Sequence, residues 1–231
     1  MKKFSIHNLD IIAAGSNPSA ICYILYPVDL LDNWIDDAAE RYGVSIAVVT
    51  HIDWDNDLTP WPAPGVPTGT QPFAGEAAQF LSLLRGSVMP EVEKRLNIAP
   101  GAVRTLAGVS LAGLFTFWQW LECDLFENII SISGSFWYEG FISWFKSRAL
   151  PHKSGRAYFL LGDKEDRAPV PQFRTVQTAT VEIVRTLTAA GVRTEFQLVP
   201  GNHYQYAIER LDRAFTAIFL PAGGNDRQNR V

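Results

Sequence analysis

The chain has 231 residues, of which 47% are hydrophobic, and a formal net charge of −4 with no basic block. A chain of this size and composition can bury a substantial core, which excludes a largely disordered protein. The acidic balance argues against a nucleic-acid partner. No apolar run reaches transmembrane length, so we expect no membrane association either.

The two cysteines, Cys22 and Cys123, are expected to be free thiols in a reducing compartment. Neither has the spacing of a metal ligand. The N-terminal Met-Lys-Lys is similar to the start of a signal peptide, but Ser5, His7 and Asp10 interrupt the apolar segment that should follow. We therefore predict a cytoplasmic protein without a metal ion or other cofactor.

The first quarter of the chain alternates β-prone runs with one helical pattern. The strands predicted here are residues 4–14, 20–26 and 44–52. Between the last two strands, apolar residues recur at helical spacing from Leu30 to Tyr42. Asp29 is the expected N-cap, Asp32 lies in the first turn, and Gly43 ends the helix.

The segment from His51 to Gly75 has no periodicity and is rich in proline and glycine. A connection of this length inside a compact domain is usually functional or disordered, and its two tryptophans argue against disorder. A helical pattern returns from Glu76 to Leu96, where Gly86 and Pro90 are expected to kink or divide the helix.

Residues 103–121 have the pattern of a buried strand, a tight turn and a buried helix. The turn reads Gly108-Val109-Ser110-Leu111-Ala112-Gly113, and small residues are needed where a strand reverses into a helix. This is the pattern of a nucleophile elbow, which exposes the Ser110 hydroxyl and directs the Leu111 N–H at an oxyanion. A glycine turn with a serine N-cap has the same pattern, so the motif alone does not decide for catalysis.

The remainder of the chain continues the alternation. The strands predicted here are residues 126–132, 157–161 and 192–199, and the helices are residues 140–147, 175–190 and one after His203. The final helix places apolar residues on one face, namely Ile208, Leu211, Phe215, Ile218 and Phe219. We predict a single α/β domain over residues 1–220, with a mostly parallel sheet covered by helices on both faces. The polar tail, residues 221–231, is expected to be disordered.

Ligands of such sheets bind at the carboxyl ends of the strands, where Ser110, the turn after Gly162 and His203 are expected to meet. A serine hydroxyl needs a base to remove its proton, and a carboxylate to hold that base in the correct tautomer. His203 is the best candidate base, although a helix-capping histidine is the alternative interpretation. His51 also follows a strand near this edge. It precedes the serine in the chain, however, which does not fit the order serine, acid, histidine that such a triad is expected to have.

The acid of the predicted triad belongs to the turn that holds Asp163, Glu165 and Asp166. The usual hydrolase acid comes about three residues after the glycine that ends its strand, which selects Glu165. Asp166 is the alternative. A solvated acidic turn without catalytic function is the other interpretation of this run.

With these motifs the chain resembles the esterase branch of the α/β-hydrolase superfamily, which includes esterase D-like enzymes and ferric-enterobactin-type siderophore esterases. The segments that carry the resemblance are residues 54–62, 108–113, 133–137, 161–165 and 199–203. The resemblance implies an α/β-hydrolase fold and a serine hydrolase mechanism with Ser110 as nucleophile, His203 as base and an acid from the turn after Gly162. The chain departs from the family in having Ala112 where many members have glycine, and Glu rather than Asp as acid. Its short length leaves little room for a large lid domain.

The second oxyanion donor of this fold comes from the loop after the third strand, which we assign to a backbone N–H near Asp53 or Trp54. The run from Asp53 to Asp57 lacks the glycine and distal glutamate of an EF-hand loop, so no calcium site is predicted there. The candidate substrate-binding aromatics are Trp54, Trp61, Trp137, Tyr138 and Tyr204. Aromatic residues are more often core than pocket, so a core position is the alternative for each.

The sequence thus predicts a serine hydrolase that cleaves carboxylic esters of small molecules through an acyl-enzyme. An acyltransferase on the same scaffold and a catalytically silent binding protein of the same fold are the alternatives. The natural substrate and the oligomeric state stay open, a homodimer included.

Overall fold

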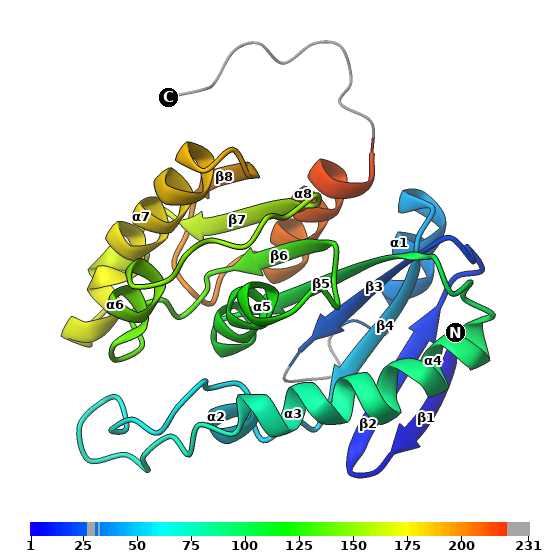
Figure 1. Ribbon diagram of the computed structural model, residues 1–231, viewed down its shortest axis with the longest axis horizontal. Coiled ribbons are helices and arrows are strands. Elements are labelled where there is room, and N and C mark those ends of the chain that lie inside the picture. The colour runs from blue at the N-terminus through cyan, green and yellow to red at the C-terminus, as the bar shows by residue number, and fades with distance from the viewer. Residues whose placement is uncertain (27–30, 32, 221–231) are drawn as a thin grey trace.

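The computed structural model describes residues 1–26, 31 and 33–220, which form an eight-stranded sheet between two layers of helices (Figure 1). The strand order is β1-β2-β4-β3-β5-β6-β7-β8. The strands are β1 (Lys2–Ile6), β2 (Leu9–Ala14), β3 (Ala20–Leu25), β4 (Ser45–Thr50), β5 (Val103–Val109), β6 (Asn128–Ile132), β7 (Arg156–Gly162) and β8 (Arg193–Val199). Pairing is parallel from β4 through β8 and antiparallel only where β2 joins β1 and β4. The predicted mostly parallel sheet is confirmed.

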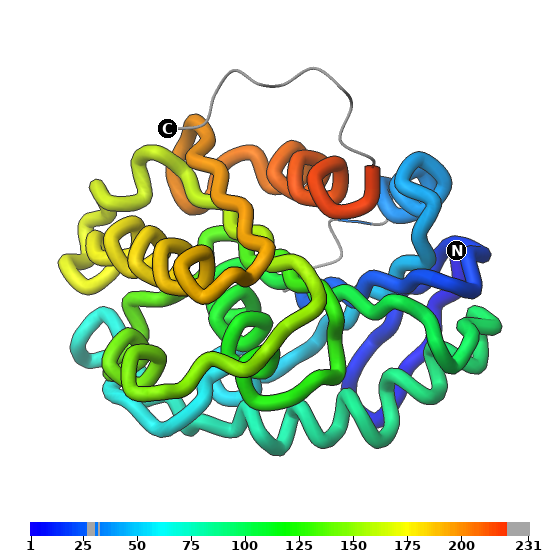
Figure 2. Tube along the Cα trace, turned by 45° about the horizontal axis from the view of Figure 1, so that its top comes forward, coloured from blue at the N-terminus to red at the C-terminus, as the bar shows by residue number. Residues whose placement is uncertain are grey.

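Helices cover both faces of the sheet. Two helices lie on one face, α1 (Ile35–Tyr42) and α8 (Ala207–Phe219), and Figure 2 shows them together along one side of the molecule. The opposite face carries α3 (Ala77–Leu83), α4 (Met89–Leu96), α5 (Leu111–Glu122), α6 (Phe141–Lys146) and α7 (Val176–Ala189). The short helix α2 (Trp54–Asp57) lies in the long connection after β4.

The central strands β3, β4 and β6 are largely apolar because both of their faces are buried, whereas the edge strands β1 and β8 carry charged and exposed residues. In β3, Ile21, Tyr23 and Leu25 join the core under α3 to α7, whereas Cys22 and Ile24 join the core under α1 and α8. This alternation follows from the two-residue period of a strand. The sheet is therefore a rigid layer that fixes where the connections at its carboxyl edge begin.

The structure differs from the sequence prediction at the N-terminus. The single strand expected over residues 4–14 is a hairpin of β1 and β2, because His7 has a positive φ of 53° and turns the chain. The expected cap Asp29, with Leu30 and Asp32, lies outside the described residues, as does the tail 221–231. The described part of that helix begins at Ile35.

The helical pattern from residue 76 to 96 is interrupted but not broken. A π-helical turn, Leu84–Val88, joins α3 to α4 and contains Gly86, while Pro90 lies in the first turn of α4. Proline is tolerated there because it interrupts few intrahelical hydrogen bonds. Over the described residues, none of the helices combines the length and hydropathy needed to cross a bilayer.

The packing predicts a large effect of truncating Phe117 on α5, which is fully buried. Its ring contacts four others, those of Phe136, Phe141, Phe145 and Phe159. Phe117→Ala should lower the free energy of unfolding by about 3–5 kcal/mol, measured by urea denaturation, because it leaves a cavity in a close-packed core. The control Leu198→Ala, at a side chain 46% exposed on β8, should change it by less than about 0.5 kcal/mol. Equal losses would contradict this description of the core.

Candidate active site

Ser110 lies at the sharp turn between β5 and α5, with φ 60° and ψ −122°. A non-glycine residue rarely adopts such a backbone conformation, and strain of this kind concentrates at functional sites. The turn is tight because Gly108 lies against the backbone of Ala112, where a Cβ atom would clash. The Ser110 N–H donates to Ile132 O at 3.0 Å, which anchors the turn to the end of β6.

His203 follows β8 and lies against the turn that carries Ser110. Its Nε2 is 3.1 Å from Ser110 Oγ, and its Nδ1 is 2.9 Å from Glu165 Oε2. An ionised carboxylate only accepts hydrogen bonds, so Nδ1 carries the proton in the neutral imidazole and Nε2 is left to accept from the serine hydroxyl. The imidazole side chain is 30% exposed, so the site opens to solvent.

The carboxylate of Glu165 lies in a short 3-10 turn after β7 and is 4% exposed. Its Oε1 accepts hydrogen bonds from Ser133 Oγ at 2.6 Å, the Gly162 N–H at 2.8 Å and Arg210 Nη1 at 3.0 Å. Burial alone would raise the pKa of Glu165. The hydrogen bonds from His203, Ser133 and Gly162 and the charge of His203 favour the ionised carboxylate. Together they outweigh burial and lower the pKa of Glu165 below its usual value. Glu165 is therefore ionised at neutral pH.

The other candidate acids and the rival base lie apart from this cluster. Asp166 Oδ1 is 3.9 Å from Arg167 Nε, and Asp163 Oδ1 accepts from the Gly201 N–H at 2.9 Å. His51 is exposed and its Nδ1 is 3.1 Å from Asp10 Oδ2 on β2. The geometry thus favours Glu165 over Asp166 and His203 over His51. In the described part of the chain, no group of three or more His, Cys, Asp or Glu could hold a metal ion.

Leu111 is the first residue of α5, so its N–H has no acceptor within the helix and lies at the positive end of the helix dipole. The assignment of a second oxyanion donor to Asp53 or Trp54 is corrected. The strand before them is β4, whereas the third strand, β3, ends at Leu25 and pairs directly with β5. In addition, the Asp53 N–H already donates to Asp57 Oδ2 at 3.1 Å. Residues 2–14 form two strands, β1 and β2, where the sequence predicts one, so the strand that ends at Leu25 is the third along the chain.

Two of the candidate substrate-binding aromatics, Tyr138 and Trp61, form hydrogen bonds that hold two connections of the fold together. Tyr138 is buried, and its hydroxyl donates to Trp61 O at 2.6 Å. Trp61 Nε1 in turn donates to Glu139 O at 2.9 Å. These bonds tie the long connection after β4 to the segment after β6. Tyr138 is therefore reassigned from the substrate pocket to the core.

The remaining candidates differ in their distance from the base. Tyr204 is 87% exposed, and its ring centroid is 5.1 Å from that of His203, so it lies at the rim of the site. Trp137 is half-buried and packs against Phe173 at 4.6 Å between centroids. Trp54 is half-buried in α2. Within the described part of the chain, Tyr204 is the one of these three aromatics whose ring contacts His203.

Sequence reasoning missed three polar residues at the site. Ser135 is fully buried, its Oγ is 3.3 Å from Ser110 Oγ, and its N–H donates to Ser110 O at 3.0 Å. Ser133 bonds to Glu165, as does Arg210, a guanidinium only 2% exposed on α8. The Ser-Gly-Ser run after a strand was a signal for the two serines. Arg210 had none, because a charged residue on an amphipathic helix normally faces solvent.

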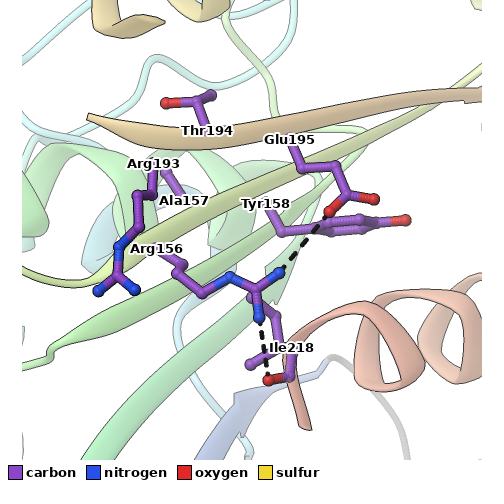
Figure 3. Close-up of a pocket in the computed structure, with 7 residues that line it drawn as sticks. All are labelled: Arg156, Ala157, Tyr158, Arg193, Thr194, Glu195 and Ile218. Carbon is purple, nitrogen blue, oxygen red and sulfur yellow. Dashed lines mark hydrogen bonds and ion pairs between the residues drawn. The ribbon is translucent and has the colours of Figure 1, made fainter. Parts of the chain in front are cut away.

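A pocket of about 250 Å³ lies at the opposite edge of the sheet (Figure 3). It is lined by the first residues of β7 and β8, whereas Glu165 and His203 follow the last residues of the same strands. Arg156 donates from Nη1 to Ile218 O at 3.3 Å and pairs through Nη2 with Glu195 at 3.7 Å, as the dashed lines show. This pocket is separate from the Ser110 site and holds no serine or histidine among its lining residues.

Comparisons with known proteins agree with the fold. No family model matches the chain. It is 28% identical over 196 residues to the uncharacterized protein YbbA of Bacillus subtilis, covering 80% of this chain and 78% of YbbA. The solved structure of an IroE-like serine hydrolase from Shewanella oneidensis superposes with a TM-score of 0.77 at 16% identity, covering 91% of this chain and 75% of that one.

A second structural neighbour is the siderophore hydrolase EstA from Aspergillus nidulans, with a TM-score of 0.67 and 18% identity, covering 90% of this chain and 88% of that one. At these identities the likeness establishes the fold. The chain has the α/β-hydrolase fold, as the sequence predicts.

The buried carboxylate predicts a pH-dependent contribution to stability. Because the folded-state pKa of Glu165 is lowered, its stabilisation is present in full above the unfolded-state pKa and is lost as pH falls through the folded-state pKa. At pH 7, Glu165→Gln should lower the free energy of unfolding by about 3 kcal/mol, since it leaves the buried Arg210 without a counter-charge. Urea denaturation between pH 7 and pH 3 should show that the difference in the free energy of unfolding between wild type and variant becomes smaller as the pH falls. A gap that stays constant below pH 4 would contradict an ionised Glu165.

Proposed function

We propose that the protein is a serine hydrolase that cleaves carboxylic esters of small molecules through an acyl-enzyme. The observation that carries this proposal is the continuous chain of contacts from Ser110 Oγ through His203 to Glu165, at 3.1 and 2.9 Å. Isolated serine and histidine pairs occur in many proteins. A strained serine at a strand-to-helix turn whose histidine is bonded to a buried carboxylate is the arrangement that nucleophilic catalysis requires.

In the first half of the reaction, His203 Nε2 accepts the proton of Ser110 Oγ as that oxygen attacks the acyl carbon. The imidazolium that forms is stabilised by Glu165, which also keeps the proton on Nδ1. The carbonyl oxygen becomes an oxyanion near the N-terminus of α5, where the Leu111 N–H can donate to it. Collapse of the tetrahedral intermediate expels the alcohol, which takes the proton from Nε2.

In the second half, a water molecule replaces the alcohol. His203 accepts a proton from this water, the hydroxide attacks the acyl-serine, and the acid product leaves as the proton returns to Ser110. The base must face solvent for this step, which agrees with a partly exposed imidazole beside the exposed Tyr204.

The class of ester is proposed from the open rim and from the neighbours. A 30% exposed base admits small esters from solvent without a domain movement. Because a structural neighbour is by name a siderophore hydrolase, siderophore esters belong in the first substrate panel beside simple p-nitrophenyl esters. Two free cysteines, Cys22 and Cys123, support the cytoplasm as the proposed compartment.

Loss of the nucleophile or the base should abolish ester cleavage. Ser110→Ala and His203→Ala should each lower kcat on p-nitrophenyl acetate by at least about 10⁴-fold, because the members of such a triad act as one unit. A fluorophosphonate probe should label wild type and fail to label Ser110→Ala. The controls are Ser82→Ala, at an exposed serine on α3, and His51→Ala, and both should retain labelling and turnover. Labelling that persists in Ser110→Ala would overturn the proposal.

The choice between the two candidate acids predicts a second contrast. Glu165→Gln should lower kcat/KM by about 10² to 10⁴-fold, because a neutral amide neither orients the imidazole nor stabilises the imidazolium. Asp166→Asn should leave kcat/KM within about threefold of wild type, since its carboxylate pairs with Arg167 outside the cluster. The reverse order of effects, measured as steady-state kinetics at pH 8, would reassign the acid.

A further inference from the structure

Arg210 on α8 is a buried cation that connects the acid and the base of the site. It is 2% exposed, and its Nη1 lies 3.0 Å from Glu165 Oε1 and 2.8 Å from Ser133 Oγ. Its Nη2 donates to Asn202 O at 2.7 Å. Asn202 immediately precedes His203, so one planar guanidinium holds the carboxylate and the backbone of the base together.

Stability is a weak explanation for this arrangement. Taking a guanidinium and a carboxylate out of water is costly, and apolar residues of similar volume often serve a core equally well. The Nε of Arg210 is buried and finds no hydrogen-bond partner among the described residues, which adds to that cost. The site is also shaped around the group, since a Cβ atom at Gly162 would clash with Nη2 and with Gly201 O.

The two oxygens of Glu165 are used for different purposes. Oε1 accepts from Arg210, Ser133 and Gly162, whereas Oε2 is left to the imidazole of His203. Three donors on one oxygen fix the rotation of the carboxylate about its last bond. A guanidinium carries its charge at every pH of interest, so it also favours the ionised acid.

Within the described residues, the charged or titratable groups that face Glu165 are Arg210 from α8 and His203 from the loop before it. The neighbouring acids on the same turn are directed elsewhere, Asp163 to the Gly201 N–H and Asp166 to Arg167. The Glu165 carboxylate therefore has two partners, of which Arg210 is permanently charged and His203 gains a proton in the proposed reaction.

We propose that Arg210 is a positioning residue of the triad, which holds the Glu165 carboxylate and the backbone at Asn202 in the one arrangement that aims Oε2 at the imidazole. This inference rests on the proposed ester hydrolysis. Arg210 does not contact the nucleophile, and it acts only through Glu165 and the loop before His203.

The test compares the pH dependence of kcat/KM for wild type, Arg210→Met and Arg210→Lys on p-nitrophenyl acetate. Arg210→Met should lower kcat/KM at pH 8 by about 10²-fold, the cost of misplacing a reacting group by about 1 Å. Its acid limb should move to higher pH by about one unit, because removing the buried positive charge favours protonation of the coupled carboxylate and imidazole pair. Arg210→Lys keeps the positive charge but loses the planar guanidinium that donates to Glu165 and Asn202 at once. Its acid limb should therefore stay in place while kcat/KM falls by about 10-fold.

A double-mutant cycle separates positioning from general destabilisation. In the Glu165→Gln background, adding Arg210→Met should lower kcat/KM by about 10-fold or less rather than by about 10²-fold, since one of the two groups through which Arg210 acts is already gone and only the bond to the backbone at Asn202 remains. Additive losses in kcat/KM would overturn the inference. If Arg210→Met does not fold, Arg210→Lys alone and in the same Glu165→Gln background completes the cycle.

The matched control is Arg104→Met, which removes a partly buried pair at the opposite end of β5. Arg104 donates to Glu93 from Nε at 2.7 Å and from Nη2 at 2.8 Å. This variant should unfold at lower urea concentration while its pH profile keeps the wild-type shape. A wild type with neither turnover nor probe labelling would refute the proposed function itself. An active wild type whose acid limb is unchanged in Arg210→Met would refute only the role of Arg210.

Discussion

The site depends on the parallel register of the four neighbouring strands β5 to β8, because that register decides which residues leave the sheet side by side. Val109 of β5 is opposite Ile132 of β6, so the next residues, Ser110 and Ser133, leave the sheet together. Gly162 of β7 is opposite Val199 of β8. The turn that carries Glu165 and the loop that carries His203 therefore leave the sheet next to each other. A slip of one residue would turn these side chains to the other face.

The cost of this arrangement is concentrated at one edge of the sheet. Ser110, Ser133 and Tyr206 have positive φ angles of 60°, 51° and 62°, and all three lie in the connections that build the site. The same edge holds the buried ion pair of Glu165 with Arg210. Strained backbone and buried charge each destabilise a fold, and they persist where the surrounding structure over-determines them. Here the sheet and the two helix layers packed on it hold the strained residues and the buried ion pair in place.

The sequence was most informative where a pattern is local. Alternating strands and helices predicted the layered fold, and the small residues around Ser110 predicted a strand-to-helix turn that the structure contains. The sequence-based prediction was wrong where an error in one strand boundary changed the assignment of a distant loop. Reading residues 4–14 as a single strand shifted the strand count, which moved the expected oxyanion loop from the end of β3 to Asp53. Arg210 could not be predicted, because its burial depends on partners 45 and 77 residues away in the chain.

The glutamate in place of the more common aspartate has a geometric explanation. Glu165 lies three residues beyond Gly162, and its carboxylate spans from the Gly162 N–H to the imidazole of His203, at 2.8 and 2.9 Å. An aspartate at this position would be shorter by one methylene, about 1.5 Å. It could then keep the bonds to Gly162 and Arg210 or the bond to His203, but not both. The longer side chain lets a single carboxylate take its support from the end of β7 and from α8 while still reaching the histidine loop. The glutamate at position 165 and the buried Arg210 therefore act together, because the longer side chain reaches His203 while the arginine holds its other oxygen.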